Sequence, residues 1–578
     1  MHRSSLKYWG ILAVVGAGMA NGLFACASDE VPAGPGTDAG PDSTTTVPDG
    51  AASDGASDGG LQALDCEVAI VGGGPGGLHT AFKLTNPPAG TTATGLTSGS
   101  GVCLFEKNDR LGGRIRDISF GPNPDDVYGT GGYRLYDNQY TADLATELGV
   151  TTAAPFAFAN LRGLQDPGGT AGQFFGYSGD AFKTMYGQTE NDDEMWVRLM
   201  CGDQVPKDGT NHPNYGSVDG GIASKSSREY VKQVLGDQGS KFFFDNNRFR
   251  ADFVDDVDAI GYMEYAVIDW FGSGATKYPI PGHSAIMNKM KAAIEAKGGR
   301  IFLSDPVSSV VNKADGTFTV TTKGRTVTAK QVVLAVPQGA MGKITGDVIT
   351  AITAQKQYAS VTSAKSMQVS HQWDKAWWKA DLRYLNAAKL VGDQIDPATA
   401  DGGKPILRAD TTIMPNGYCI NSIEMPPTPH HDALKVTRTV YSDNRACVDK
   451  NLTLYGSGGT AGEQALNAEL VKSLRILFPA VFDGSANEPK ITKTDVNVHD
   501  EAWFFLKKGA TANGVTNKGV FDWSSNPVTG KKVYLVGDAW YPLGSGWANA
   551  AYISSIRVLN DHFGFTMPSH ELPTVACP

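Results

Sequence analysis

Four uninterrupted runs of apolar residues predict the core of a β-sheet. They lie at positions 68–71, 102–105, 332–336 and 533–536. Runs of this length without polar alternation are typical of strands that are buried on both faces of a parallel sheet. Because the runs come from the beginning, the middle and the end of the chain, we expect distant segments to share one sheet.

The pattern between these runs predicts helices and further strands. Residues 180–275 carry few strand signals and a longer apolar period, which indicates a mainly helical lobe. A helix is expected to begin within 282–294, and another to cover 550–559. Residues 300–307 are typical of a strand, and Asp315-Gly316 of the hairpin turn that follows. The predicted fold class is therefore α/β.

Three glycines after the first run have the spacing of a dinucleotide-binding turn. Gly72 permits a tight turn, Gly74 lets the backbone approach a pyrophosphate, and Gly77 lets the following helix pack on the strand. Glu106 ends the second apolar run, where an acidic side chain is expected to bind an adenosine ribose. It stands 34 positions after Gly72, farther than is usual, because a Pro/Gly-rich loop at 85–101 intervenes. A nicotinamide-binding domain, or a glycine-rich turn with no ligand, is the alternative.

Motifs at both ends of the chain resemble those of the flavin-containing amine oxidase family. Residues 110–114 read Arg-Leu-Gly-Gly-Arg, like the second glycine motif of that family. Near the other end, a strand ends in Gly537-Asp538 and is followed by Gly546-Trp547. The resemblance extends in outline over residues 64–565. It implies that the chain binds FAD.

The resemblance also implies how this chain holds FAD. Gly113 and Arg114 are expected over the cofactor phosphates, and Asp538 at the ribityl and phosphate region, although the family more often has glutamate there. Trp547 is expected against the flavin, and the Val307 backbone near the adenine. Because residues 540–546 contain no cysteine, the FAD is expected to be non-covalent.

Within that family, the L-amino acid oxidases are the most similar group. Arg134, in the segment 129–135, resembles their arginine that binds the substrate carboxylate. A guanidinium can bind a carboxylate through two parallel charge-assisted hydrogen bonds. Tyr441 resembles the tyrosine that gives that carboxylate a further hydrogen bond, and Gly546 and Trp547 complete the expected substrate site. A structural arginine in a loop and a core or surface tyrosine are the alternatives.

Lys365 is the expected catalytic residue. Its strand-like segment is followed by Trp377-Trp378, as in the family strand whose lysine lies near flavin N5. The resemblance implies that this lysine holds a water molecule and aids reoxidation by oxygen. A solvent-facing strand lysine is the alternative.

These motifs predict oxidation of an L-amino acid to a 2-oxo acid, with release of ammonia and hydrogen peroxide. A polyamine or monoamine oxidase of the same family would share the FAD motifs and have no need of Arg134 as a carboxylate clamp. A non-catalytic surface lipoprotein that keeps FAD is a further alternative. The sequence leaves the substrate side chain and homo-oligomer formation open.

The N-terminus predicts export. Residues 1–26 have cationic residues, a short apolar core and Leu-Phe-Ala-Cys at 23–26, and so resemble a bacterial lipoprotein signal peptide. Lipidation of Cys26 would anchor the chain at a membrane surface, in the periplasm or at the cell surface. Plain signal cleavage is the alternative. Residues 27–62 are rich in Asp, Ser, Gly and Pro and are expected to form a disordered linker.

Composition narrows the classes of ligand. The chain has 578 residues, is 41% hydrophobic and carries a net charge of −10, which argues against nucleic acid as a partner. Its 7 cysteines form no Cys-x-x-Cys pair, and no histidine cluster has metal-ligand spacing, so no metal site is expected. Disulfides are permitted after export, but their pairing stays open.

These observations predict a Rossmann-type FAD-binding domain interleaved with a mixed β-sheet and a helical substrate-binding lobe. The expected FAD-binding segments are 63–140, 281–345 and 495–578. The segment 141–280 is expected to form the helical substrate lobe, and 346–494 the substrate-binding domain.

Overall fold

Alternate residues of the first strand belong to two different hydrophobic cores. Strand β1 (Gln62–Val71) runs parallel to β2 (Val102–Phe105) on one side and to β13 (Arg325–Leu334) on the other. Val68 and Ile70 pack into one core, and Ala69 and Val71 into the other. Burial on both faces explains why this run of the sequence is continuously apolar.

The structure is a computed structural model. It describes residues 61–155, 161–164, 173–175, 189–190, 192–201, 222–246, 249, 256–379, 396–401, 404–406, 411–413, 419–456, 458–478 and 481–571. All of them belong to one compact unit of the chain. The predicted signal peptide, its Cys26 and almost all of the predicted linker lie outside the described residues.

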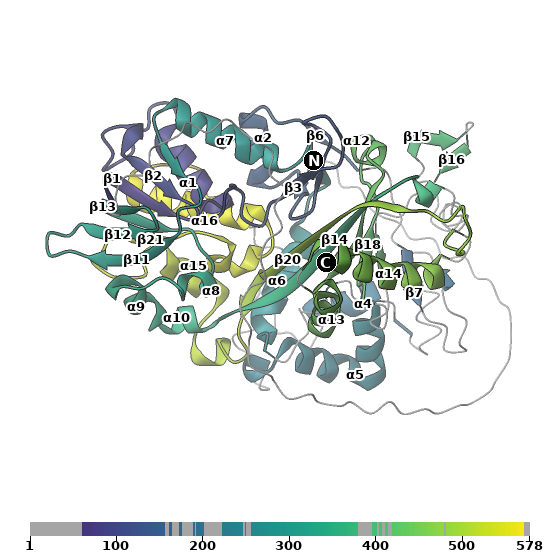
Figure 1. Ribbon diagram of the computed structural model, residues 1–578. Helices are drawn as coiled ribbons and strands as arrows, with labels where there is room; N and C mark the ends of the chain where they lie inside the picture. Colours follow the sequence, from purple (N-terminus) through teal and green to yellow (C-terminus); the bar gives the residue numbers. More distant parts are fainter. Residues whose placement is uncertain are drawn as a thin grey trace. The chain divides into compact units, whose positions relative to one another are not determined.

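The first sheet joins distant parts of the chain, as predicted (Figure 1). Its strand order is β10-β2-β1-β13-β12-β11, and β21 pairs with the end of β13 beyond β12. The remaining strands are β10 (Arg300–Phe302), β11 (Val307–Asn312), β12 (Phe318–Thr322) and β21 (Val533–Leu535). The turn predicted at Asp315-Gly316 lies between β11 and β12.

Helices cover both faces of this sheet. Helices α1 (Pro75–Thr85), α7 (Ser284–Ala296) and α16 (Ala548–Phe563) contribute to the core on one face. Helices α8 (Gln338–Met341), α9 (Asp347–Thr353) and α15 (Asn517–Ser524) contribute to the core on the other. The α/β class with a Rossmann-type arrangement is thereby confirmed.

The second sheet carries two long antiparallel strands, β14 (Val361–Trp373) and β20 (Ile491–Leu506). Its order is β20-β14-β19-β18-β17-β7-β8. The other members are β19 (Val436–Ser442), β18 (Ser422–Glu424), β17 (Thr411–Ile413), β7 (Leu161–Leu164) and β8 (Gln173–Phe175). Helices α13 (Arg445–Tyr455) and α14 (Gly459–Leu477) pack on one face of it.

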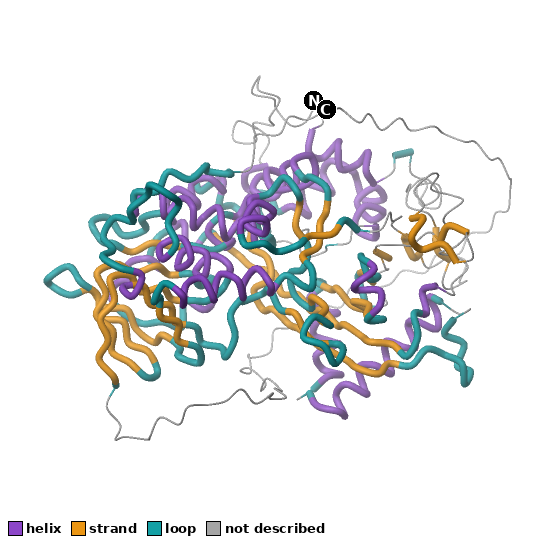
Figure 2. Tube along the Cα trace, turned by 90° about the horizontal axis from the view of Figure 1, so that it is seen from above, coloured by secondary structure: helices purple, strands orange, loops and turns teal. Residues whose placement is uncertain are grey.

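Three helices form a third core. They are α4 (Asp192–Cys201), α5 (Ser227–Asn246) and α6 (Ala259–Gly272). The three helices lie within residues 180–275, for which the sequence predicts a helical lobe. The wider range 141–280, however, also contains β7 and β8, which join the second sheet because β7 pairs with β17. Figure 2 shows these helices and strands by secondary structure.

The remaining α-helices and strands of the described chain are short, and short 3-10 helices lie between some of the elements. These remaining α-helices and strands are α2 (Tyr140–Glu147), β3 (Asp117–Ser119), β4 (Val127–Gly129), β5 (Leu135–Tyr136), β6 (Thr152–Ala153), β9 (Thr276–Pro279), α10 (Lys356–Ala359), β15 (Asp396–Asp401), β16 (Lys404–Ile406) and α12 (Pro429–Ala433). Within the described part of the chain, two disulfides join Cys66 to Cys103 and Cys419 to Cys447. The first links the neighbouring strands β1 and β2.

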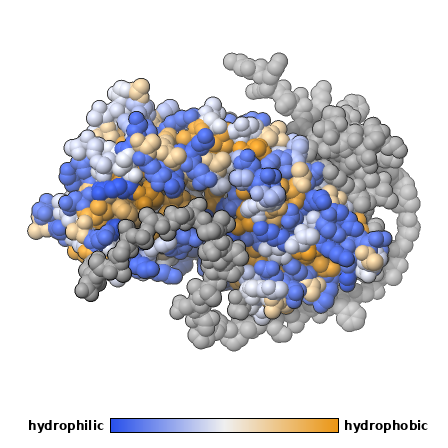
Figure 3. Space-filling model, turned by 45° about the horizontal axis from the view of Figure 1, so that its top comes forward, coloured by the Kyte–Doolittle hydropathy of each residue, from blue (hydrophilic) through white to orange (hydrophobic). Residues whose placement is uncertain are grey.

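The surface is mostly polar on the face drawn in Figure 3, where hydrophilic residues predominate and smaller hydrophobic patches lie between them. Among the described residues, the exposed large hydrophobic side chains are Leu61, Val197 and Val311. In this part of the chain no helix is both long enough and apolar enough to cross a membrane.

Candidate functional site

The turn between β1 and α1 needs two of its glycines for steric reasons. Gly72 has φ +106°, and a Cβ there would lie 2.5 Å from the Ala335 carbonyl oxygen. A Cβ on Gly77 would lie 2.0 Å from the Gly72 carbonyl oxygen. At Gly74, the N-cap of α1, a Cβ would meet nothing within 4 Å. The backbone is therefore accessible in front of the helix N-terminus, where an anion is favoured.

Glu106 closes this turn from the side of β2. Its carboxylate accepts hydrogen bonds from the backbone N–H of Gly73, at 2.7 Å, and of Asn108, at 2.9 Å. Its own backbone carbonyl accepts a hydrogen bond from the N–H of Asp305. This brings the segment that begins β11 at Val307 next to Glu106, as the predicted adenine side of the site requires.

Arg114 and Asp538 meet although they come from opposite ends of the chain. Arg114 donates to both carboxylate oxygens of Asp538, and one of its nitrogens also donates to the Ala502 carbonyl. Asp538 further accepts from the Gly546 N–H, at 3.2 Å. A Cβ on Gly113 would lie 3.3 Å from the Gly74 Cα. The structure therefore brings both predicted glycine motifs and the late Gly-Asp and Gly-Trp elements together.

Aromatic rings gather beside Gly546. Tyr441 and Trp503 are stacked, with ring centroids 6.0 Å apart and planes 19° apart. The Phe249 ring lies 5.6 Å from Tyr441 and 5.7 Å from Trp503. Because a Cβ on Gly546 would lie 2.4 Å from the Trp503 indole, only glycine lets the chain pass this close to the ring. We call these three rings, together with Trp547, which directly follows Gly546 in the chain, the aromatic box.

Arg134 lies at the Trp547 end of this box. Its guanidinium carbon is 5.8 Å from the centroid of the Trp547 ring. One of its nitrogens lies 3.8 Å from a carboxylate oxygen of Glu424, and the side chain is 21% exposed. Tyr441 is among the four tyrosines that interact electrostatically with the guanidinium. Arg134, Tyr441, Gly546 and Trp547, all predicted substrate residues, are thus brought to one place.

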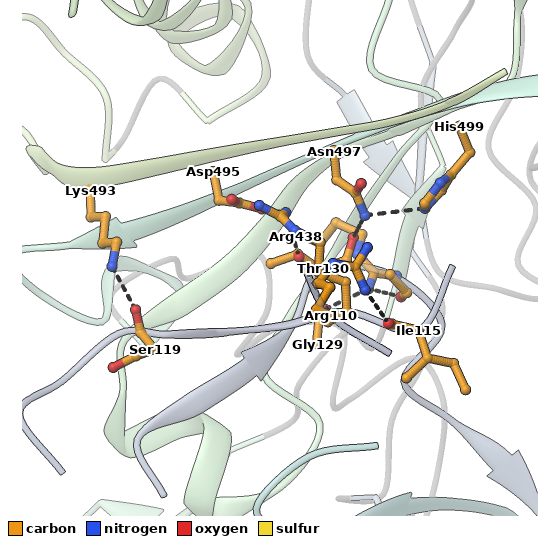
Figure 4. A network of polar contacts seen from close by, with 12 residues as sticks. Arg110, Ile115, Ser119, Gly129, Thr130, Arg438, Lys493, Asp495, Asn497 and His499 are labelled. Atoms are coloured by element: carbon orange, nitrogen blue, oxygen red, sulfur yellow. Dashed lines mark hydrogen bonds and ion pairs between the residues drawn. The ribbon is translucent and has the colours of Figure 1, made fainter. Parts of the chain in front are cut away.

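A buried ion pair, which the sequence reasoning missed, supports the Arg134 loop. Arg438 on β19 donates to Glu424 on β18 at 2.7 Å, and both side chains are 1% exposed. Arg438 also donates to the carbonyls of Gly129 and Gly131, at 2.7 and 2.8 Å. Figure 4 shows Arg438 beside this loop. Arg438 therefore fixes the backbone that presents Arg134.

Asp269 on α6 is a second acid that the sequence did not indicate. The Trp547 indole hydrogen-bonds to its carboxyl group, and Arg134 acts on it electrostatically. Burial raises the pKa of Asp269 to about 6, although both partners act in the opposite direction. Asp269 and Trp547 also line a cavity of about 200 Å³, together with Tyr140, Tyr265 and Asn549.

Lys365 is placed differently from the prediction. Its ammonium group lies 3.4 Å from Asp500 and 3.9 Å from Asp449 of α13. Met367 and Val369, at the alternate positions that follow Lys365 on β14, belong to the core beneath α14, so Lys365 lies on the helix-covered face of the sheet. The sequence alone did not show which face of this strand is covered by helices.

Comparisons with known proteins agree with this architecture. A family model described as flavin containing amine oxidoreductase matches residues 76–558. Aplysianin-A from Aplysia kurodai is 23% identical over 354 residues, which are 54% of this chain and 60% of that protein. Achacin from Lissachatina fulica is 22% identical over 354 residues, 54% of this chain and 62% of that protein. The chain thus spans about three fifths of these relatives.

Solved structures show the same fold. Putrescine oxidase bound to putrescine is similar with a TM-score of 0.59 and 16% sequence identity, over 86% of this chain and 99% of that chain. A triple mutant of putrescine oxidase has a TM-score of 0.59 and 18% identity over the same shares. At such identities the likeness concerns the fold and not the substrate.

Proposed function

Because this chain belongs to the flavin containing amine oxidoreductase family, we propose that it is an FAD-dependent oxidase of L-amino acids. The products are a 2-oxo acid, ammonia and hydrogen peroxide. The observation that carries the proposal is the position of Arg134, a permanent cation at the end of the aromatic box. An amino acid differs from a simple amine by its carboxylate, and Arg134 is the group suited to bind it.

The described residues fit FAD. The open backbone at Gly74 and the N-terminus of α1 suit the pyrophosphate, and Arg114 adds positive charge beside it. Glu106 would hold the ribose, Val307 would lie by the adenine, and Asp538 would face the ribityl chain. When bound, FAD supplies the two-electron chemistry: it takes a hydride from the substrate and passes the electrons to oxygen. We propose that FAD is held without a covalent bond.

The side chains at the box then position the substrate. Arg134 binds the carboxylate through two hydrogen bonds, and the Tyr441 hydroxyl donates a third. The aromatic walls exclude water from the Cα–H bond that is to break. Binding as the neutral amine leaves the nitrogen lone pair available, so that loss of hydride would give the protonated imino acid. Water then converts the imino acid to the 2-oxo acid and ammonia.

Glu424 gives a reason to keep a second candidate function. Its oxygen lies 3.8 Å from Arg134, and Asp269 acts on the same guanidinium. If these two acids neutralise Arg134, the arginine is structural, and a polyamine or monoamine without a carboxylate is the substrate. The two functions differ in one measurable property, the contribution of the substrate carboxylate to binding.

We further propose that the chain acts outside the cytoplasm, anchored through a lipid at Cys26 after removal of residues 1–25. The two disulfides support the proposal, because disulfides persist in oxidising compartments. Mass spectrometry of the membrane fraction checks it: a diacylglycerol-modified Cys26 is the expected result, and a chain that begins at an unmodified residue contradicts the anchor.

The experiment that tests the oxidase function uses the purified chain without residues 1–62. Hydrogen peroxide release is measured with the twenty L-amino acids and with a panel of polyamines and monoamines. We expect release with L-amino acids alone. Release with amines alone supports the second candidate, and bound flavin that neither panel bleaches without oxygen contradicts both.

A further inference from the structure

The two faces of β14 differ in what they meet. Met367 and Val369 belong to the core beneath α14. On the other face, Ser366 and Gln368 pair in register with His499 and Asn497 of β20. Asn497 donates to the Thr130 carbonyl at 2.8 Å, so this face looks toward the loop that carries Arg114 and Arg134. We call it the inner face.

The inner face holds polar atoms without partners. Ser366 Oγ, Gln368 Oε1 and Ser370 Oγ are buried and have no hydrogen-bond partner among the described residues. Buried polar groups are nearly always satisfied in folded proteins. Three such atoms at alternate positions of one strand therefore indicate that a polar ligand or water completes this face.

His499 connects the inner face to the cofactor side. Its ring lies 3.2 Å from the Asn497 amide nitrogen, as Figure 4 shows. Burial, followed by the charges of Arg114, Arg110, Arg116 and Arg438, lowers the pKa of His499 to about 3. The imidazole is therefore neutral at physiological pH. Since Arg114 also contacts Asp538, His499 lies within electrostatic reach of the proposed phosphate side.

Gln368 connects the same face to the substrate side. It pairs in register with Tyr441 on β19, and Tyr441 stacks on Trp503 in the aromatic box. A flavin ring that extends from Arg114 toward the aromatic box would therefore lie over the part of the inner face between His499 and Gln368. Lys365, in contrast, has its ammonium group with Asp449 and Asp500 on the side of α13.

We propose that the flavin ring of this chain faces Gln368 and His499, and that no lysine ammonium of the described residues contacts its reactive edge. The proposal rests on the FAD binding of the proposed function, but not on the identity of the substrate. Gln368 offers an amide donor and an acceptor to the polar edge of the ring, and His499 a neutral imidazole. Both are positioning residues.

Sulfite titration of the bound flavin tests this without any substrate. Sulfite uses its sulfur lone pair to form a bond to flavin N5, without a leaving group, and the adduct gains negative charge on the ring. A cation at the inner face stabilises that charge. A cation on the opposite face of β14, which α13 and α14 cover, is too distant to stabilise it. We expect Gln368→Lys to lower the sulfite Kd by about tenfold or more, and Lys365→Met to leave it within about twofold.

Further variants distinguish a specific effect on the flavin from misfolding of the chain. Gln368→Met and His499→Gln are expected to shift the visible absorption bands of the flavin, while His371→Gln, at a buried histidine on the α14 side of the same strand, is expected not to. A large change in sulfite Kd for Lys365→Met, with none for Gln368→Lys, would overturn the proposal. A purified chain without flavin would overturn it together with the proposed function, whereas amine turnover in place of amino acid turnover would leave this test intact.

Discussion

Arg114 and Asp538, 424 positions apart in the sequence, form a two-point ion pair in which the guanidinium meets both carboxylate oxygens. The pair joins the loop after β2 to the short turn that precedes α16. It thereby closes the nucleotide-binding turn of the N-terminal segment with the C-terminal segment. Cofactor affinity is expected to depend on both residues.

The first prediction follows from that contact. Arg114→Ala removes a charge beside the phosphates and leaves Asp538 without its partner, so FAD affinity is expected to fall about tenfold or more. The measurement is the Kd of FAD for the apoprotein, from quenching of flavin fluorescence. Arg475→Ala is the control, since Arg475 pairs with Glu488 on the surface. Equal losses in both variants would contradict a specific role for Arg114.

The second prediction concerns the buried pair under the Arg134 loop. Glu424→Gln leaves Arg438 buried without a counter-charge, which is expected to cost about 3–5 kcal/mol of unfolding free energy. Glu488→Gln, at the surface pair with Arg475, is expected to cost about 1 kcal/mol or less. Urea denaturation of both variants measures the difference. A Glu424→Gln variant as stable as its control would show that the pair does not fix the loop.

The third prediction is a pH dependence of substrate binding. The pKa of Asp269 is raised from 3.8 to about 6 by burial, so the group is neutral below pH 6 and ionised above it. Ionised Asp269 competes with the substrate carboxylate for Arg134. The KM for an L-amino acid, expressed for its neutral-amine form, is therefore expected to rise as pH increases through 6, whereas deprotonation of the amine lowers the KM based on total substrate. Asp269→Asn is expected to remove this rise, and an unchanged profile in that variant would contradict the competition.

The raised pKa of Asp269 also predicts the direction in which protein stability changes with pH. A carboxyl group with a folded-state pKa above its unfolded value stabilises the fold below the unfolded pKa, and this contribution is lost as pH rises through the folded pKa. Asp269→Asn is thus expected to gain stability relative to the unmodified chain at pH 8 compared with pH 5. Thermal unfolding at the two pH values measures it. A difference of the opposite sign would mean that pairing of the ionised carboxylate with Arg134 dominates.

The fourth prediction concerns the disulfides. Peptide mapping of the oxidised chain is expected to find Cys66 joined to Cys103 and Cys419 joined to Cys447. Replacing Cys66 and Cys103 together by alanine is expected to cost about 2–5 kcal/mol, because the bond constrains the unfolded chain. Free thiols at these four positions in protein isolated from the exported fraction would contradict the pairing.

The sequence predicted the parts of the fold that depend on the local pattern of apolar residues and glycines. The apolar runs at 68–71 and 533–536 predicted strands buried on both faces, and the spacing of Gly72, Gly74 and Gly77 predicted the turn, because both properties are set by neighbouring residues. That Arg134, Tyr441 and Trp547 share one site could be predicted only from the resemblance to the family. Their roles in substrate binding stay predictions.

Other features depend on contacts between distant residues. A lone arginine on a strand, such as Arg438, has no local signature, and its partners Glu424, Gly129 and Gly131 come from other elements. Lys365 was predicted at the flavin from the resemblance, whereas its place beside Asp449 and Asp500 depends on which face of β14 is covered by helices. The Cys66–Cys103 pairing likewise depends on β1 and β2 being neighbours, and the Cys419–Cys447 pairing on the packing of α13 beside the segment before β18.

The most direct measurement of the central claim compares Arg134→Met with the unmodified chain. For both, kcat/KM is determined for an L-amino acid and for the amine that lacks its carboxylate. We predict that Arg134→Met lowers kcat/KM for the amino acid by about 100-fold and changes that for the amine by about threefold or less, since two charge-assisted hydrogen bonds are lost in the first case alone. Equal effects on both substrates, or an amine that the unmodified chain prefers, would contradict the account.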